Sequence, residues 1–257
     1  MRDGWTQRIQ DELAQVWAVA VKDVRVYYLT PPMIMFGLLL PFFLFFSFSI
    51  KREISAEVGI ARLLALTTFF TASSAGPVII PMERRARTYD RLLAAPMSLV
   101  TLLLGKTLVG AFFAVVVSVV PLAVGLFWLH VTVANAGLLV ACAVLASLAF
   151  SAFGLVFGSI PTSSAAAVGS IMMPSTLVRW PLLFISGIFI PLGEMASWAR
   201  ALAYLSPLTY AQDLMNHAVL GTGYLNWGLD LTLLLILLAV FLLLAVRMHH
   251  RSRELGY

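Results

Sequence analysis

The stretch that decides the fold runs from Glu83 to Lys106 and reads ERRARTYDRLLAAPMSLVTLLLGK. Six of the nine residues from 83 to 91 are charged, whereas only 11% of the 257-residue chain is Asp, Glu, Lys or Arg. Long uncharged apolar runs flank this cluster on both sides. Because an ionised side chain at bilayer depth costs about 3 kcal/mol or more, we expect the stretch to be a water-exposed connector between two membrane spans. It is also the expected contact site for another protein.

The composition predicts an integral membrane protein. The chain is 61% hydrophobic with a mean hydropathy of +0.94, whereas soluble domains are roughly 45–50% apolar. The net charge of +5 does not indicate nucleic-acid binding, because the basic residues are spread over several short segments without interleaved aromatic residues. The single cysteine, Cys142, lies in an apolar run, so we expect neither an intramolecular disulfide nor a Cys-rich metal site.

Six apolar runs are expected to cross the membrane as helices, which predicts an all-α integral membrane protein with one domain, 1–257. A run of 20 residues without charge is long enough, at about 1.5 Å per residue, to cross a hydrocarbon core of about 30 Å. Pro77 and Pro81 are expected to bend or end the second span. The expected spans are residues 31–50, 63–82, 107–129, 138–157, 166–190 and 227–246.

Two further segments are expected to lie at the membrane surface. In residues 1–30, apolar residues recur every three or four positions, which predicts an amphipathic interfacial helix. A helix docked on another subunit is the alternative. Acidic residues precede the first apolar run, so no signal peptide is expected. The semi-polar segment 191–223 is too mixed to cross, and we expect short helices that dip into the outer interface.

The distribution of basic residues predicts the topology. Six crossings place both termini and the 83–106 connector on one side, which then carries twelve of the 17 Lys and Arg residues, against four on the other side. Basic residues are enriched on the cytoplasmic side of membrane proteins. The termini and the connector are therefore expected in the cytoplasm, and the chain in the cell membrane.

No motif predicts catalysis by this chain. Gly105, Lys106 and Thr107 resemble the end of a phosphate-binding P-loop, but position 100 holds Val100 instead of the required glycine and no strand precedes it. We expect Lys106 to extend toward lipid headgroups instead. There is no G-x-S-x-G motif and no histidine spacing typical of a metal site. The chain is therefore predicted to be a non-enzymatic subunit that holds no cofactor or metal.

Two residue pairs, one polar and one of glycines, each leave an alternative open. Asp213 and His217 are four residues apart and fit an ion pair, or a weak metal site. Gly154 and Gly158 form a G-x-x-x-G motif, which allows helices to approach closely. We expect this motif to pack within the chain, with a dimer seam as the alternative.

A substrate path is predicted from hydroxyl-bearing and aromatic residues of the second and fifth spans, which would suit an amphipathic lipid or a hydrophobic drug. Back-bonding of the hydroxyls to their own helix is the alternative. Arg179 lies inside an apolar run; it lines the path or, alternatively, pairs with lipid phosphate nearer the surface. The predicted path residues are Thr67, Thr68, Phe69, Phe70, Thr71, Arg179 and Phe184.

Three segments carry a resemblance to a known family. They are YLTP at 28–31, the connector MERRARTYDRLLAAPMS at 82–98, and LFISGIFIPLGEMASWARALAYLSPLTYAQDLM at 183–215. The last resembles the Ser-Gly-x-x-x-Pro and Pro-Leu-Thr-Tyr signatures of the permease subunits of type 2 ATP-binding-cassette exporters. The signature residues are Ser186, Gly187, Pro191 and Pro207 to Tyr210.

The resemblance implies a mechanism. In that family the connector is a coupling helix seated in a separate ATPase, two permeases pair with two ATPases, and the segment after the fifth span is an external re-entrant hairpin. ATP and Mg²⁺ would then bind the partner, and a second copy of this chain would complete a homodimer. Arg179 matches no signature position. The expected coupling residues are Glu83, Arg84, Arg85, Arg87, Tyr89 and Asp90.

Two other classes remain as alternatives. A polytopic enzyme acting on lipids would require clustered carboxylates or histidines at one interface. An ion-coupled secondary transporter would require broken helices in matched halves or carboxylates inside a span. Neither pattern is expected here.

Overall fold

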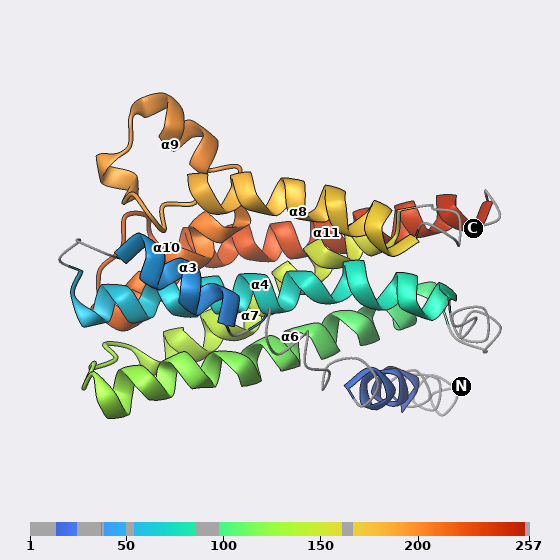
Figure 1. Cartoon of the computed structure of the whole chain (residues 1–257), viewed down its shortest axis with the longest axis horizontal. Coiled ribbons are helices and arrows are strands. Elements are labelled where there is room, and N and C mark those ends of the chain that lie inside the picture. The colour runs from blue at the N-terminus through green and yellow to red at the C-terminus, as the bar shows by residue number, and fades with distance from the viewer. Residues whose placement is uncertain are drawn as a thin grey trace, which may run out of the picture.

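A computed structural model of the chain describes residues 14–24, 37, 39–49, 54–85, 98–160 and 167–254. Every regular element within these residues is a helix (Figure 1), which confirms the all-α prediction. After a first helix at 14–23, the elements are α3 (Leu40–Ser49), α4 (Ala56–Arg85), α6 (Leu99–Ala123), the π-helical η3 (Val124–Trp128), α7 (Ala136–Gly158), α8 (Ala167–Ile185), the 3-10 helix η4 (Leu192–Glu194), α9 (Ser197–Ala203), α10 (Pro207–Leu220) and α11 (Trp227–Glu254).

Four of the described helices are long and apolar enough to cross a membrane: α4, α6 with η3, α7 and α11. They correspond to the second, third, fourth and sixth expected spans. The fifth expected span corresponds to α8, a shorter apolar helix, and the described part of the first span corresponds to α3. The described residues therefore include four candidate membrane spans, as expected of a membrane protein.

Two helix boundaries differ clearly from those of the apolar runs that predicted the spans. The helix α6 begins at Leu99 instead of residue 107, because Ser98 caps it: the Ser98 Oγ accepts a hydrogen bond of 3.0 Å from the Thr101 backbone N–H. At the other boundary, α8 ends at Ile185 instead of residue 190, because Gly187 adopts a positive φ of 89° and turns the chain.

The helix α4 is the central element of the bundle. In the most apolar stretch of α4, 89% of the residues are buried inside the protein, whereas the corresponding share in α11 is 17%. Pro77 and Pro81 lie inside α4, which continues to Arg85, so of the two expected effects, a bend or an end of the helix, the end does not occur. Since α4 contacts α6, α7, α8 and α10, the surrounding helices hold it together where the two prolines remove backbone hydrogen bonds.

Glycines bring α4 and α7 into backbone contact. A Cβ atom added at Gly154 of α7 would lie 2.5 Å from the Ser73 carbonyl oxygen of α4, and one added at Gly158 would lie 2.5 Å from the Gly76 carbonyl oxygen. The G-x-x-x-G motif therefore packs within the chain, which confirms that prediction over the dimer seam.

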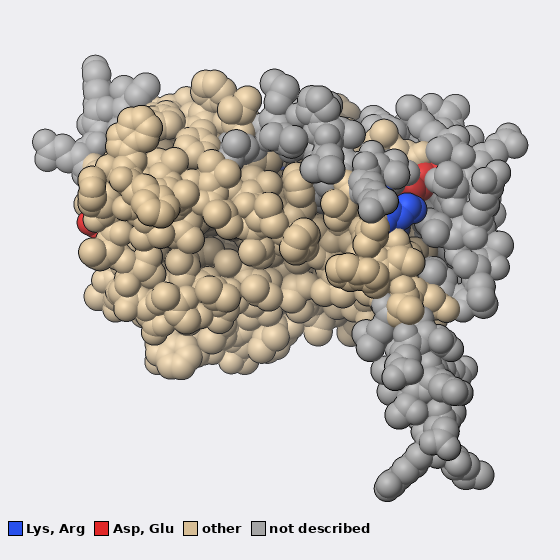
Figure 2. All heavy atoms as spheres, turned by 90° about the horizontal axis from the view of Figure 1, so that it is seen from below, with Lys and Arg blue, Asp and Glu red and all other residues tan. Residues whose placement is uncertain are grey.

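The two ends of the bundle differ. The helix 14–23 and the ends of α4 and α11 lie at one end, and η4, α9 and α10 lie at the other (Figure 1). The helix α9 projects from the bundle, whereas α10 packs into it with fully buried residues such as Leu214 and Met215. On the face shown in Figure 2, charged side chains appear only near the two ends, as expected for a bundle whose middle lies in lipid.

Candidate functional site

Four charged side chains meet at the base of the 83–106 connector. The Lys106 Nζ donates to Glu83 Oε2 at 2.7 Å and to Asp23 Oδ2 at 3.2 Å. The Lys22 Nζ donates to Glu83 Oε1 and lies 2.8 Å from Asp23 Oδ1. These residues, here called the charge cluster, come from the helix 14–23, α4 and α6. Two ammonium groups and two carboxylates alternate, so the cluster is neutral as a whole.

The charge cluster is buried. Asp23 and Glu83 are fully buried, and Lys106 is 4% exposed. Removing such charges from water costs several kcal/mol each, and only their mutual pairing offsets that cost. Burial alone would lower the pKa of Lys22, but hydrogen bonds to Asp23 and Glu83 raise it above the ordinary 10.5. A raised lysine pKa means that Lys22 stays charged at neutral pH and loses its proton only in strongly alkaline solution.

The helix 14–23 is seated on α6 at Gly105. A Cβ atom there would lie 3.4 Å from the Val16 carbonyl oxygen and from Val19, so the missing side chain lets the two helices approach. Val19 is buried against α4 and α6 residues such as Ile80 and Leu102. Figure 1 shows this helix almost along its axis while the bundle helices run across the view, so it lies crosswise to them. It docks on its own chain, in the orientation expected of an interfacial helix.

Two expectations about this region change. Lys106 does not extend toward headgroups, because it points into the protein and pairs with two carboxylates. Asp23 was not among the predicted site residues. Its signal in the sequence is a carboxylate next to the apolar stripe of an amphipathic helix, three residues after Ala20 and four after Val19.

The predicted coupling residues lie partly inside the chain. Glu83 belongs to the charge cluster, and the Arg84 Nη1 donates to the Ile160 carbonyl oxygen at 3.3 Å, which links α4 to the end of α7. The side chain of Arg85 lies outside the described residues, as do Arg87, Tyr89 and Asp90 and the expected coupling helix.

The predicted path residues of α4 form part of the core. Thr68 donates to the Leu64 carbonyl oxygen at 2.8 Å, so back-bonding, the alternative, is what occurs there. Thr71 instead donates to the Gly37 carbonyl oxygen at 3.0 Å. The ring of Phe69 packs edge-to-face against that of Phe150 of α7, with ring centroids 5.0 Å apart. The buried side chains are Thr67, Thr68, Phe69, Phe70 and Thr71. They belong to the packed core of the described residues, and their part in a substrate path stays a prediction.

The two predicted path residues of α8 differ from each other. Arg179 is 6% exposed; its Nη1 donates to the Ser74 Oγ of α4 at 2.7 Å and its Nε to the Ser175 carbonyl oxygen at 3.3 Å. It therefore lies within the protein and holds α8 against α4. Phe184 is 47% exposed and stacks on Trp180, so it presents an aromatic surface to the outside of the subunit.

The signature residues after α8 have structural roles. Within the signature, the Thr209 Oγ1 donates to the Ala203 carbonyl oxygen at 2.5 Å and the Tyr210 hydroxyl to the Tyr204 carbonyl oxygen at 2.5 Å. The Ser206 Oγ, just before the signature, donates to the Leu182 carbonyl oxygen at 3.0 Å. These bonds connect the ends of α8 and α9 to the start of α10. The signature thus holds together the turn that sends α10 back into the bundle.

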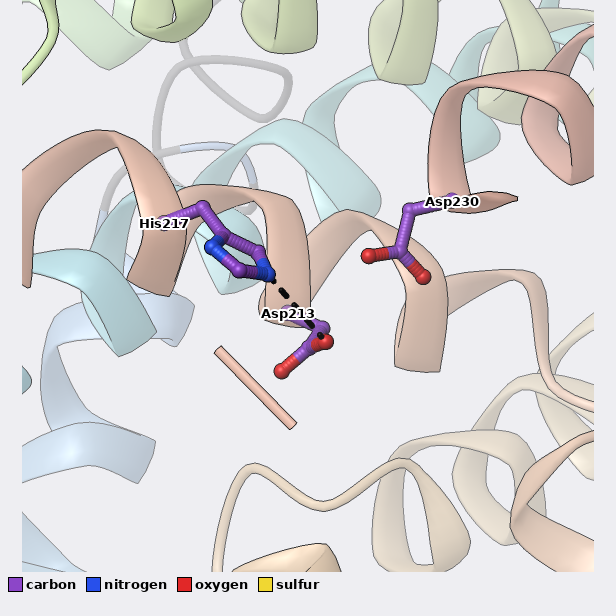
Figure 3. Close-up of side chains that lie close together, drawn as sticks. All are labelled: Asp213, His217 and Asp230. Carbon is purple, nitrogen blue, oxygen red and sulfur yellow. Dashed lines mark ion pairs between the residues drawn. The ribbon is translucent and has the colours of Figure 1, made fainter. Parts of the chain in front are cut away.

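Asp213 and His217 form the predicted pair, with the His217 Nε2 4.0 Å from Asp213 Oδ2. Asp230 of α11 lies beside them (Figure 3) and is fully buried. It lies within the sixth expected span, 227–246, so the expectation that no carboxylate falls inside a span is wrong. The signal was a lone Asp three residues after the start of that apolar run.

Comparison with known proteins agrees with this architecture. A family model described as "ABC-2 type transporter" matches residues 14–220. Over 169 residues the chain is 24% identical to the "Probable multidrug ABC transporter permease YbhR" of Escherichia coli strain K12, and equally to the protein of that name in E. coli O157:H7. The match covers 65% of this chain and 45% of those proteins, so the chain spans less than half of their length. This chain belongs to the ABC-2 type transporter family.

Proposed function

We propose that the chain is the membrane-spanning subunit of an ATP-driven exporter, powered by a separate ATPase subunit that binds ATP and Mg²⁺. Family membership supports a transporter subunit, and no nucleotide-binding motif is present in the sequence. The observation that carries the proposal is the charge cluster, because it joins both flanks of the connector to the helix 14–23.

The charge cluster offers a route by which a partner's motion would reach the bundle. Glu83 ends the apolar part of α4 and Lys106 lies in the second turn of α6, so a force on the intervening connector acts on both helices at once. The ion pairs carry that force to the helix 14–23 as well. Since α4 also contacts α8 and α10, its displacement would reach the opposite end of the bundle.

Two copies of the chain and two ATPase subunits would form the exporter, with both termini in the cytoplasm and the 191–223 segment as the external re-entrant hairpin. The exposed apolar faces of α6 and α11 provide surface for lipid and for a second copy; they include Phe112, Val116, Ile236 and Leu243.

The cargo we propose is a hydrophobic or amphipathic molecule, such as a drug, a lipid or a lipid-linked glycan, taken from the cytoplasm or the inner leaflet. The name of the E. coli relative supports the drug class. Because the hydroxyl-bearing residues of α4 are buried, we place the path along the exposed face of α8, where Met173, Leu177 and Phe184 lie. Arg179 supports this face from behind through Ser74.

Charge reversal in the connector tests the proposal. The triple variant Arg84→Glu, Arg85→Glu, Arg87→Glu should no longer bind the ATPase subunit in co-purification and should lose ATP-driven transport in proteoliposomes. A matched control reverses three arginines at the end of α11 (Arg247, Arg251 and Arg253), which changes the charge equally. The single variant Arg84→Ala measures what the Ile160 contact contributes. Full transport by the connector variant would contradict the proposal.

A further inference from the structure

Three ionisable side chains converge at the end of the bundle opposite the charge cluster. Asp213 and His217 lie one turn apart on α10, and Asp230 lies in the first turn of α11 (Figure 3). One potential ligand atom from each lies within 4.8 Å of the other two. The proposed function does not use this group.

Asp230 is the anomalous member. It is fully buried, and within the described part of the chain no donor group is hydrogen-bonded to either of its carboxylate oxygens, which interact with the carboxylate of Asp213. Asp213, in contrast, accepts hydrogen bonds from the backbone N–H groups of Tyr224 and Leu225 at 2.8 Å and 2.6 Å. Burying two neighbouring carboxylates, one of which has no hydrogen-bond donor, is costly unless a positive charge or a proton accompanies them.

We propose that Asp213, His217 and Asp230 bind a divalent transition-metal ion of the zinc class. Carboxylate oxygens and an imidazole nitrogen are ligands that zinc takes in proteins, and a fourth position would remain for water. The double positive charge would balance both carboxylates and give the Asp230 oxygens their missing partner. An imidazole ligand favours zinc over magnesium or calcium, which prefer oxygen ligands.

The geometry requires a modest contraction. Ligand atoms of a tetrahedral zinc site with bonds of about 2.0–2.1 Å lie roughly 3.3 Å apart, so the trio must close from its present span of up to 4.8 Å. The His217 Nε2 lies 2.8 Å from the Leu225 carbonyl oxygen. To bind the ion through this atom, His217 would give up that hydrogen bond and carry its proton on Nδ1.

Neighbouring residues leave room and access for the ion. A Cβ atom at Gly223 would lie 2.2 Å from the His217 Nε2, so only glycine leaves the imidazole its position. Asp213 lines a cavity of about 400 Å³, together with Glu194 and Gln212, and His217 lines a second cavity of about 400 Å³. The ion could enter from either one. Once bound, it would link α10 to α11 beside the external end of α4.

Zinc binding to the purified full-length chain tests the proposal. The protein is treated with a chelator in detergent, and Zn²⁺ alone is added while bound metal is measured by equilibrium dialysis and elemental analysis. We expect one Zn²⁺ per chain that depends on the trio, with a higher melting temperature. Asp230→Asn and His217→Gln should each lower the affinity at least tenfold. Glu194→Gln, in the adjoining cavity, is the matched control and should leave it unchanged.

The same experiment can overturn the proposal. If Zn²⁺ binds the wild type no more tightly than it binds Asp230→Asn and His217→Gln, the trio is not a metal site. The same conclusion follows if Glu194→Gln lowers the affinity as much as Asp230→Asn. If Asp230→Asn fails to fold, His217→Gln and Gly223→Ala, which displaces the imidazole, still decide the matter. None of these readouts requires the ATPase subunit, so failure here leaves the proposed function untouched.

Discussion

Lys106 shows how one residue can take on a role that its sequence position conceals. It lies near the start of an apolar run, where a lysine ordinarily reaches for headgroups, but the structure turns it toward Asp23 and Glu83. These partners are 83 and 23 residues away in the chain. No local pattern predicts such a contact, because periodicity reports only which residues share a helix face.

Removing one carboxylate from the charge cluster should destabilise the protein. Glu83→Gln removes one of the two carboxylates that pair with Lys22 and Lys106, and breaking a buried ion pair typically costs about 3–5 kcal/mol. We expect a loss of roughly 3 kcal/mol, at the low end of that range, because the Lys22 side chain remains 33% exposed. The melting temperature in detergent, with and without denaturant, measures the effect.

The control for this variant is Glu57→Gln, a partly buried glutamate in the first turn of the same helix. Reversal of all four charges, with Lys22→Glu, Asp23→Lys, Glu83→Lys and Lys106→Glu together, keeps their alternation and should recover part of the lost stability. Equal stability of Glu83→Gln and Glu57→Gln would show that the cluster contributes nothing measurable.

At the scale of the helix, the contact between α4 and α7 depends on the absence of side chains at two glycines. Gly154→Ala would place its methyl group 2.5 Å from the Ser73 carbonyl oxygen, and neither backbone has a flexible group that can yield. The helices must separate, which should cost about 1–3 kcal/mol. Thermal unfolding in detergent measures this.

Gly137→Ala in the first turn of α7 is the matched control, since its added methyl group would meet only the Asn135 side chain, at an ordinary 3.5 Å. A helical alanine there should be neutral or slightly stabilising. If the two variants have the same melting temperature, the α4–α7 packing is looser than described.

Hydropathy predicted α7 almost completely, as 138–157 against Ala136–Gly158, because turn residues bound that apolar run on both sides. It failed at the start of α6, where apolar residues directly follow the connector and the capping Ser98 marks the boundary instead. The buried hydroxyls of α4 could be placed only once its neighbours were known. A serine or threonine in a span looks the same whether it faces a path or its own backbone.

For the whole molecule, the predicted orientation can be tested with introduced cysteines. The native Cys142 is fully buried, so a membrane-impermeant maleimide should not label it in intact cells. Ser197→Cys at the start of α9 should be labelled from outside, and His250→Cys near the end of α11 only after the membrane is opened; both positions are exposed. The reverse pattern would invert the topology and move the connector away from any cytoplasmic ATPase.

The class of the molecule followed from its composition, because a 61% hydrophobic chain has too little polar surface to cover a soluble globule. The trio at the far end did not follow from the sequence as a group. Asp213 and His217 are visible as a helical pair, but Asp230 joins them only because α11 packs against α10. When a single carboxylate lies near the end of an apolar run, the sequence does not show which other helix it will contact.

The position of the helix 14–23 has a consequence for biosynthesis. This helix is synthesised before α4 and α6, so Lys22 can meet Glu83 only after 61 further residues and Asp23 can meet Lys106 only after 83. Until α4 and α6 have been inserted, the charged side chains of this helix remain in contact with water and headgroups. Docking of this helix through the charge cluster therefore depends on the prior insertion of α4 and α6.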